Sequence, residues 1–408
     1  MPFVVYVLGL ATFAQGTSEY MLSGLTPDIA RDIGVSIPMA GLLTSVFAVG
    51  MIVGAPFMAA VSIGWPRRRA LLTFLSVFLL SHVMSALSEN FWLLLSMRAV
   101  AAVANAGFLA VGLSAAAATV EDRLRGRATS VLLSGVTVAC VIGVPAGAVL
   151  GGIWGWRSAF WAVSIISVPA LIATLYSIPA EVKSAGQRPS VLGEARALKR
   201  PDVILVLLLA AIINAATFCT FTYVSPLVVH VTQIPQDWVP AVLALFGAGS
   251  FLGSNIGGRL ADARHRRVIE YGGAALFLGW GALYFAAADT AAVLVLLFVL
   301  GILWFAVGSM LVARALEVAW EAPRLGGGFS TAAFNVGAAI GPLAGGLGID
   351  RGLGYRSPAW ESSLLMALAF VIMGLFRMRG VTPLGPPTAR SAEARSAHCP
   401  HPSRNTSL

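Results

Sequence analysis

A glutamate stands inside an apolar segment near the start of the chain. Between Phe3 and Leu25, Glu19 is the one charged residue. In a helix, it would share a single polar stripe with Thr12, Gln15 and Ser23. A polar stripe on an otherwise apolar spanning helix is expected to face a water-filled cavity. The chemistry open to such a carboxyl group is the uptake and release of a proton.

Arg98, inside the apolar run 91–118, is the matching cation. Glu19 and Arg98 each lie about seven residues from the same side, roughly 10 Å deep at 1.5 Å per residue, so they lie at matching depth. Burial favours the neutral carboxyl group and Arg98 favours the charged one, so the protonation of Glu19 could change with its surroundings. A fixed ion pair that never titrates is the alternative. Asp28 is a second proton-coupling candidate, or else a solvated residue at a helix end.

The composition indicates which solvent surrounds these residues. The chain is 58% hydrophobic and 11% charged, against about 25% charged residues in soluble domains. Runs of about 20 apolar residues can cross a bilayer as helices, and the alternation typical of barrel strands is missing. The sequence therefore predicts an all-α polytopic membrane protein with twelve transmembrane helices: 3–25, 39–62, 70–88, 91–118, 127–151, 157–179, 203–229, 239–261, 268–288, 290–313, 327–349 and 358–378.

The distribution of cations predicts the orientation. With the N-terminus inside, 22 Lys and Arg residues fall in cytoplasmic loops and tails and four fall outside. The positive-inside rule then makes both termini cytoplasmic. Because the basic residues sit at helix ends, they suit anionic lipid headgroups. The net charge of +9 is therefore interpreted as a bilayer contact, and no nucleic-acid partner is expected.

The two halves of the chain repeat each other. At a shift of 199 residues, Pro27 falls on Pro226, Phe47 falls on Phe246, and "GWRSAFW" (155–161) falls on "GYRSPAW" (354–360). The repeat predicts two pseudo-symmetric six-helix bundles, an architecture typical of secondary transporters. A duplicated membrane scaffold without transport is the alternative. The expected parts are an N-terminal bundle (1–179), a cytoplasmic linker (180–202), a C-terminal bundle (203–378) and a disordered cytoplasmic tail (379–408).

Loop and glycine motifs carry a resemblance to a known family. "GRLADARHRR" (258–267), "GVPAGAVLGG" (143–152) and "GAAIGPLAGG" (337–346) resemble motifs of the major facilitator superfamily, in its twelve-helix drug:proton antiporter branch. The resemblance implies a gating motif of Asp262, Arg266, Arg267, Arg67 and Arg68, although Ile63 replaces the usual acid in the first half. It also implies packing motifs that contain Gly143, Pro145, Gly147, Gly341 and Pro342. Small residues let helices approach closely, so glycine-rich packing seams alone are the alternative.

A narrower resemblance rests on longer stretches. "FAQGTSEYMLSGLTPDIA" (13–30) and "NVGAAIGPLAGG" (335–346) are similar to bacterial chloramphenicol-resistance exporters, a subgroup that also includes sugar exporters. This implies efflux of a small drug, driven by the proton gradient without a cofactor. We expect a monomer in the bacterial inner membrane. An exporter of sugars or metabolites and a passive facilitator without proton coupling stay open as alternatives.

The resemblance implies a central cavity lined by the first, fourth, seventh and tenth helices, which is the predicted substrate site. Because the first and fourth helices both line it, we expect a contact between Glu19 and Arg98. Asn214, Phe218 and Phe221 share one face of the run 203–229, and aromatic surface with amide donors suits a neutral aromatic ligand with polar groups. Packing against lipid or protein is the ordinary alternative for such aromatic residues. The full predicted set is Gln15, Glu19, Asn105, Asn214, Phe218, Phe221, Trp304 and Asn335.

Other side chains suggest no competing chemistry. His82 is interpreted as a buried, hydrogen-bonded packing residue. His398 and His401 flank Cys399 in a tail without periodicity, so we expect no metal site there. Because neither a His-Glu-x-x-His helix nor a Ser/His pair of the intramembrane protease kind is present, we do not expect an enzyme.

Overall fold

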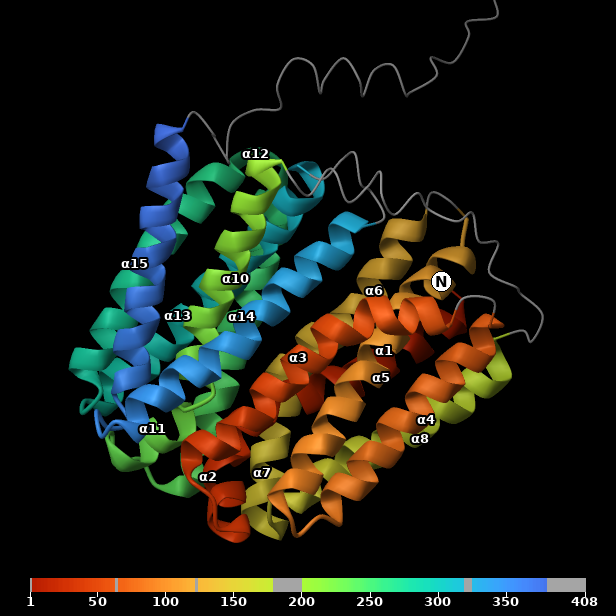
Figure 1. The fold of residues 1–408 in the computed structure, drawn as a ribbon, viewed down its shortest axis with the longest axis horizontal. Helices are drawn as coiled ribbons and strands as arrows, with labels where there is room; N and C mark the ends of the chain where they lie inside the picture. The colour runs from red at the N-terminus through yellow and green to blue at the C-terminus, as the bar shows by residue number, and fades with distance from the viewer. Residues whose placement is uncertain (1, 63–64, 122–123, 179–199, 319–324, 380–408) are drawn as a thin grey trace, which may run out of the picture.

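A computed structural model describes residues 2–62, 65–121, 124–178, 200–318 and 325–379 (Figure 1). These residues are helical apart from short connections. The elements are α1 (Phe3–Tyr20), α2 (Leu22–Ile33), α3 (Ile37–Val61), α4 (Arg67–Ala86), α5 (Phe91–Ala118), α6 (Arg125–Val138), the π-helix η2 (Ala139–Gly143), α7 (Val144–Trp154), α8 (Arg157–Ser177), α10 (Pro201–Phe221), α11 (Val224–His230), the 3₁₀ turn η3 (Gln236–Trp238), α12 (Val239–Ala286), α13 (Thr290–Val318), α14 (Leu325–Asp350) and α15 (Ser357–Met378).

Eleven helical stretches in the described residues are long and apolar enough to cross a membrane. They correspond to eleven of the twelve predicted segments. The remaining segment is the first, which the structure divides into α1 and α2. Its hydropathy is lowered by the polar residues from Gln15 to Glu19, which are the residues that made it a candidate site. The protein is therefore a polytopic α-helical membrane protein, as predicted.

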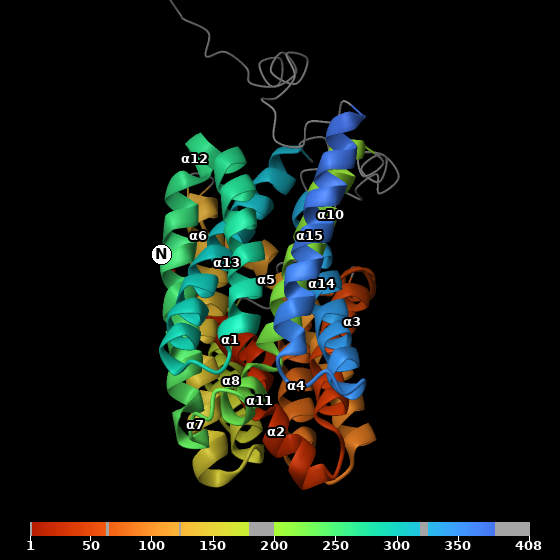
Figure 2. The same ribbon diagram turned by 90° about the vertical axis from the view of Figure 1, so that its left-hand side faces the viewer.

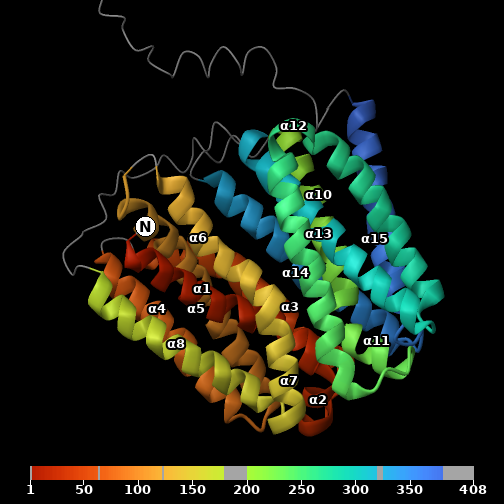
Figure 3. The ribbon, with the colours of Figure 1, turned by 180° about the vertical axis from the view of Figure 1, so that it is seen from behind.

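Each half builds its own hydrophobic core. One core runs from Val5 to Ile178, and the other consists of residues from Val203 to Met373 together with three alanine and valine side chains of the first half. Seen from the side, the second half lies in front of the first (Figure 2), and seen from behind, the helices of each half form one bundle (Figure 3). The predicted linker, apart from residues 200–202, and the predicted tail beyond residue 379 lie outside the described residues.

The two predicted spans 239–261 and 268–288 form one unbroken helix, α12, so the expected loop between them is helical. Gly253 packs against the backbone of Ile302, and Gly279 packs against the side chain of Leu300. A straight helix would separate two residues 26 positions apart by about 39 Å. Because both glycines meet the same part of α13, α12 bends back on itself (Figure 3). The stretch between the spans contains no proline and keeps its backbone hydrogen bonds within the helix.

The first spanning helix of each half is interrupted a few residues ahead of a proline. The first half breaks at Met21, ahead of Pro27, and the second half breaks at Thr222 and Tyr223, ahead of Pro226. Proline lacks an N–H group and clashes with the carbonyl group four residues earlier, which accounts for the break at Thr222 but not for the break at Met21. The predicted end of the first helix at Leu25 is wrong, because Pro27 lies within α2, which continues to Ile33.

The halves meet at the end formed by α2, α7 and α11, and their ribbons diverge toward the opposite end (Figures 1 and 3). The side chain of Gln236 donates a hydrogen bond of 2.8 Å to Asp28 across this seam. Gly41 lies against the ring of Tyr223, which leaves no space for a side chain at that position. The contacts between the halves therefore join them at one end of the molecule.

An ionic cluster at the same end joins the loops that connect the helices of the first half. Arg157 forms an ion pair with Asp32, and Trp156 donates an Nε1–H hydrogen bond of 3.0 Å to the same carboxylate. Arg157 also donates to the carbonyl oxygen of Ser88 at 2.9 Å. The hydrogen bond from Arg157, followed by that from Trp156, lowers the pKa of Asp32 below its ordinary value. This cluster joins the start of α8 to the end of α2.

The lowered pKa of Asp32 predicts an acid-sensitive contribution to stability. A depressed carboxyl pKa stabilises the fold above the unfolded value of about 3.9 and ceases to do so as pH falls through the folded value. We expect Asp32→Asn to be less stable than the wild type at neutral pH and equally stable once the pH has fallen below the lowered pKa of the folded state. Thermal unfolding in detergent between these limits checks this. Glu89→Gln, at an exposed carboxylate of a neighbouring loop, should behave like the wild type at every pH.

The close approach of α12 and α13 predicts the effect of one methyl group. A Cβ atom at Gly253 would lie 2.8 Å from the carbonyl carbon and 2.9 Å from the Cα atom of Ile302. Because backbone atoms cannot move aside, Gly253→Ala should lower the free energy of unfolding by about 1–3 kcal/mol. A Cβ atom at Gly374 meets nothing within 4 Å, so Gly374→Ala should be neutral or stabilising by up to about 1 kcal/mol. Equal stability of the two variants would contradict this packing.

Candidate functional site

Arg98 lies on α5 and is completely buried in the N-terminal bundle. Its Nη1 atom donates a hydrogen bond of 2.7 Å to the hydroxyl group of Ser18 on α1. Its guanidinium carbon lies 4.2 Å from the ring centre of Phe47 on α3, a cation–π contact. The Nε and Nη2 atoms have no hydrogen-bond partner in the described part of the chain. Arg98 therefore keeps one unpaired edge, although water cannot reach it from the surface.

His82 on α4 extends the same network. Its Nε2 atom lies 2.6 Å from the hydroxyl oxygen of Ser18, and its Nδ1 atom lies 2.8 Å from the carbonyl oxygen of Phe78. Arg98 can only donate to Ser18, so the one hydroxyl proton of Ser18 is directed to Nε2 of His82. Nδ1 then carries the ring proton and donates it to Phe78. The histidine is 1% exposed, so the expected buried and hydrogen-bonded residue is observed.

Glu19 follows Ser18 in the last turn of α1 and keeps some accessible surface. Arg98 is the cation whose charge acts on its carboxylate. No ion pair of 4.0 Å or shorter joins the two residues, in contrast to the expected contact. The physical reason is the position of Arg98, whose guanidinium is held by Ser18 and stacked on Phe47. The structure thus brings the predicted acid and base close together but keeps them unpaired.

Two buried amides next to this network also lack partners. Gln15 on α1 and Asn105 on α5 are each 1% exposed. Neither the Nε2 and Oε1 atoms of Gln15 nor the Oδ1 atom of Asn105 has a hydrogen-bond partner within the described residues. A buried polar group without a partner costs about 1–3 kcal/mol. Such groups are suited to binding water or the polar atoms of a ligand.

The second half contains an aromatic cluster that contacts Tyr20, the residue after Glu19. Tyr20 of α1 stacks on Phe218 of α10, with ring centres 5.9 Å apart. Phe218 lies 6.0 Å from Trp304 of α13, in an edge-on arrangement. Phe221 and Phe246 lie 4.7 Å apart, and both contact the ring of Trp304. The predicted aromatic residues therefore meet in one cluster, which Tyr20 joins from the other half.

Asn214 orients this cluster. Its Oδ1 atom accepts a hydrogen bond of 3.2 Å from Nε1 of Trp304, and its Nδ2 atom donates one of 2.6 Å to the carbonyl oxygen of Phe334. Both halves of the amide are thus engaged, and the indole ring is fixed. The side chain of Asn335 donates instead to Thr331 of its own helix at 3.0 Å. Asn214 therefore acts on the cluster, whereas Asn335 bonds locally.

The sequence repeat aligns polar site residues of the first half with polar and aromatic site residues of the second half. The shift of 199 residues places Gln15 on Asn214, and it places Asn105 on Trp304. Asn214 and Trp304 are hydrogen-bonded to each other, whereas Gln15 and the Oδ1 atom of Asn105 have no hydrogen-bond partner within the described residues. The first half thus presents amides where the second half presents an amide and an indole.

Sequence reasoning missed four contributors to the site: Ser18, Phe47, Tyr20 and Phe246. The repeat pairs Phe47 with Phe246, and this was the signal that could have identified them. Phe47 contacts Arg98 in the first half, and Phe246 contacts Trp304 in the second half. Ser18 and Tyr20 flank Glu19 in sequence, and no local pattern distinguishes them.

The remaining predicted residues lie away from this network. Asp28 accepts its hydrogen bond from Gln236 and also lies 3.6 Å from Arg31, at the seam between the halves. In the gating motif, the side chains of Asp262 and Arg266 lie outside the described residues. Arg267 is exposed, and Arg67 and Arg68 are partly exposed at the start of α4.

The glycine motifs lie where helices pack tightly. A Cβ atom at Gly143 would meet Thr17, and one at Gly147 would lie 3.2 Å from Cβ of Met21, so α1 and the fifth spanning helix pack closely. A Cβ atom at Gly341 would lie 2.8 Å from the backbone nitrogen of Cys219. The carbonyl group of Pro342 accepts a hydrogen bond of 2.8 Å from the hydroxyl group of Tyr223.

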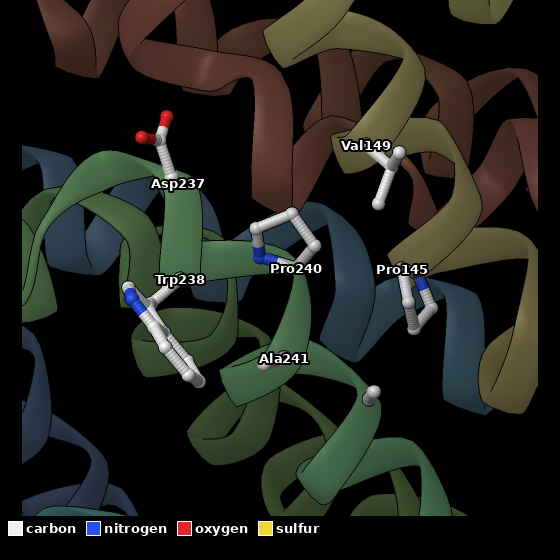
Figure 4. Close-up of a pocket in the computed structure, with 7 residues that line it drawn as sticks. Pro145, Val149, Asp237, Trp238, Pro240 and Ala241 are labelled. Carbon is white, nitrogen blue, oxygen red and sulfur yellow. The ribbon is translucent and has the colours of Figure 1, made fainter.

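Pro145 lines a pocket of about 550 Å³ between α7 and the start of α12. Pro145 and Val149 face Pro240 and Ala241 across it (Figure 4). The lining is apolar except for Asp237, and it includes none of the predicted substrate residues. The pocket is therefore a feature of the seam between the halves and not part of the site around Glu19.

Comparison with known families agrees with this architecture. The family model described as Major Facilitator Superfamily matches residues 8–327. The chain belongs to this superfamily.

Its curated relatives are membrane transport and resistance proteins. A chloramphenicol resistance protein of Streptomyces lividans is 47% identical over 379 residues, which cover 92% of this chain and 97% of that protein. The inner membrane transport protein YdhP of Escherichia coli K12 is 34% identical and covers 90% and 94% of the two chains. A probable sugar efflux transporter of Helicobacter pylori is 29% identical and covers 93% and 95%.

The fold is also similar to a solved transporter structure. A bacterial homologue of the human lysosomal transporter Spinster, in an inward-facing and occupied conformation, superposes with a TM-score of 0.70. The similarity covers 91% of this chain and 96% of that one, at 16% identity. The family resemblance found in the sequence and the predicted fold class are therefore both confirmed.

The engagement of Asn214 predicts a stability difference between two asparagines. Asn214→Ala should lower the free energy of unfolding by about 1–3 kcal/mol, because it leaves the indole N–H of Trp304 and the carbonyl group of Phe334 without their partner. Asn335→Ala should have a smaller effect, since its amide bonds only within its own helix. Unfolding in mixed detergent micelles, followed by tryptophan fluorescence, measures both. A larger loss for Asn335→Ala would contradict this description of the cluster.

Proposed function

We propose that the protein exports a small amphipathic drug, with chloramphenicol as the first candidate, in exchange for protons by alternating access. The observation that carries the proposal is the position of Glu19. It stands in sequence between Ser18, which binds the buried Arg98, and Tyr20, which stacks on Phe218 of the aromatic cluster, and the charge of Arg98 acts on its carboxylate. The 47% identity to a Streptomyces lividans chloramphenicol resistance protein supports the choice of drug.

The two halves suit different parts of such a ligand. The second half offers the faces of Phe218, Phe221 and Trp304 to an aromatic ring. The first half offers the unpaired amides of Gln15 and Asn105 to hydroxyl and amide groups. A neutral ligand with an aromatic end and a polar end would therefore lie across the seam, with its polar end toward α1 and α5. Tyr20, which stacks on Phe218, would lie at the boundary.

The proton supplies the driving force in this proposal. Glu19 would take up a proton when the site opens to one side and release it when the site opens to the other. One charge that crosses 100 mV gains about 2.3 kcal/mol, and one pH unit adds about 1.4 kcal/mol. Together they sustain a drug gradient of a few hundred-fold, on the order of tenfold per 1.4 kcal/mol. No resident cofactor takes part in this scheme.

The same proposal includes a location and an orientation. The 22 cations on one side of the helices favour a bacterial inner membrane with both termini in the cytoplasm. The halves then meet on the outer side, through Asp28 and Gln236, and the site faces inward. A monomer with one site between two bundles is sufficient for transport, and the lipid bilayer is its required partner.

A second candidate keeps the transport cycle and changes the cargo. The unpaired amides of Gln15 and Asn105 would also bind the hydroxyl groups of a sugar or metabolite, and one relative is a probable sugar efflux transporter. A passive facilitator without proton coupling would need the same cavity but no titrating Glu19. Drug resistance and proton coupling separate these candidates.

The test uses Glu19→Gln in proteoliposomes that contain the full chain. In the wild type, an imposed pH gradient should drive chloramphenicol accumulation. In Glu19→Gln, accumulation should fall to the level of protein-free liposomes, because a neutral amide cannot exchange a proton. Exchange of labelled drug in the absence of a gradient should persist in the variant.

Controls separate the alternatives. Glu89→Gln, in an exposed loop, should accumulate drug like the wild type, and Asp28→Asn tests the second acid. A wild type that equilibrates the drug across the membrane but accumulates none under an imposed pH gradient, with or without a protonophore, would leave only passive facilitation. Growth of a sensitive bacterial host on a drug panel tests the cargo, and a wild type that protects against no drug would favour the sugar or metabolite exporter.

A further inference from the structure

We propose that Ser18 and His82 are positioning residues that hold Arg98 away from Glu19, so that Glu19 stays free to exchange its proton. This inference rests on the proposed role of Glu19 as the proton carrier. It assigns a function to two residues that carry neither proton nor drug, and it explains why an acid and a base at one depth do not pair.

The geometry of Arg98 is the first support. An arginine beside a carboxylate ordinarily forms a bidentate pair through two parallel N–H groups. Here one N–H group is engaged by Ser18 at 2.7 Å, and the guanidinium is stacked over Phe47 at 4.2 Å. The Nε and Nη2 atoms stay without partners. The Nε and Nη2 edge of Arg98 could therefore bind a carboxylate, but it forms no ion pair with Glu19.

The role of His82 follows from the direction of the hydrogen bonds. Ser18 has a single proton, and Nε2 of His82 accepts it at 2.6 Å. This leaves the lone pairs of Ser18 for Arg98. Nδ1 of His82 is anchored to the carbonyl oxygen of Phe78 at 2.8 Å, and the ring packs against Phe78 and Phe160. Because Ser18 is completely buried, surface water cannot replace His82 as the acceptor.

The charged and titratable groups around Glu19 are few within the described residues. Arg98 acts from α5, with His82 of α4 behind it through Ser18. Tyr20 neighbours Glu19 on α1, and Cys140 lies on η2. From the second half, Phe218 stacks on the neighbouring Tyr20 and does not titrate. The position of Arg98 is thus the main local control over the charge of Glu19.

Loss of the hydrogen bonds that join Arg98, Ser18 and His82 should therefore change the pH at which Glu19 loses its proton. Without Ser18 or an acceptor at residue 82, the guanidinium of Arg98 can turn to Glu19 and stabilise its carboxylate. The proton of Glu19 would then be lost at a lower pH, by roughly one pH unit, as expected when a cation moves into contact with a carboxyl group. If Ser18 and His82 had a purely structural role, their loss would lower the protein yield and leave the midpoint pH of Glu19 deprotonation unchanged.

Infrared difference spectroscopy of the full chain in lipid nanodiscs measures the midpoint without any drug. The carboxylic acid C=O band that disappears in Glu19→Gln identifies the group, and its loss with rising pH gives the midpoint. We expect Ser18→Ala and His82→Phe to move the midpoint to lower pH. His82→Gln, which keeps an acceptor for Ser18, should restore it toward the wild-type value.

Ser85→Ala is the matched control, because Ser85 is a buried serine of α4 that bonds only the carbonyl group of Ser81. It should leave the midpoint unchanged. If the Glu19 band has the same midpoint in Ser18→Ala as in the wild type, the positioning role is overturned and the proposed function stays intact. If no band distinguishes the wild type from Glu19→Gln, then Glu19 is not the proton carrier, and the proposed coupling fails together with this inference.

Discussion

A permanently charged guanidinium inside a membrane bundle is the constraint around which the first half is arranged. Removing Arg98 from water carries a penalty of several kcal/mol, which partners must offset. Ser18 supplies a hydrogen bond, Phe47 supplies the face of an aromatic ring, and His82 fixes Ser18. These residues come from α1, α3, α4 and α5, so one buried charge sets how four helices meet. Glu19 lies one residue beyond this junction and receives the electrostatic influence of Arg98.

The duplicated halves use the same backbone devices for different purposes. Each first helix breaks ahead of a proline, and each half contains glycines that bring helices into backbone contact. On this shared scaffold the side chains have diverged. Gln15 and Asn105 are polar and unpaired, whereas Asn214 and Trp304 bond to each other inside an aromatic cluster. A symmetric fold thereby encloses an asymmetric site, as an amphipathic ligand requires.

Much of the site could be predicted from the sequence, because a polar residue inside a membrane-spanning segment is unusual and indicates a function. Glu19, Arg98, Gln15 and Asn105 stood out because an intramembrane polar group is expensive without a purpose. The hydrogen-bond partner of Arg98 did not stand out, since Ser18 is an ordinary small residue and its two partners come from helices 64 and 80 positions away in sequence. The expected Glu19–Arg98 contact failed for the same reason. Equal depth in the membrane places two residues at one level but does not decide which neighbour each one bonds.

The sequence by itself determined the membrane class, the twelve spans, the duplication and the superfamily. These follow from hydropathy, charge asymmetry and local motifs, which act over one helix length at a time. Tertiary structure alone decided that α12 bends back as one unbroken helix, that the first helix breaks beyond Glu19, and that Arg98 binds Ser18 instead of Glu19. Each of these outcomes depends on contacts between helices, which the hydropathy and motifs of a single segment do not specify.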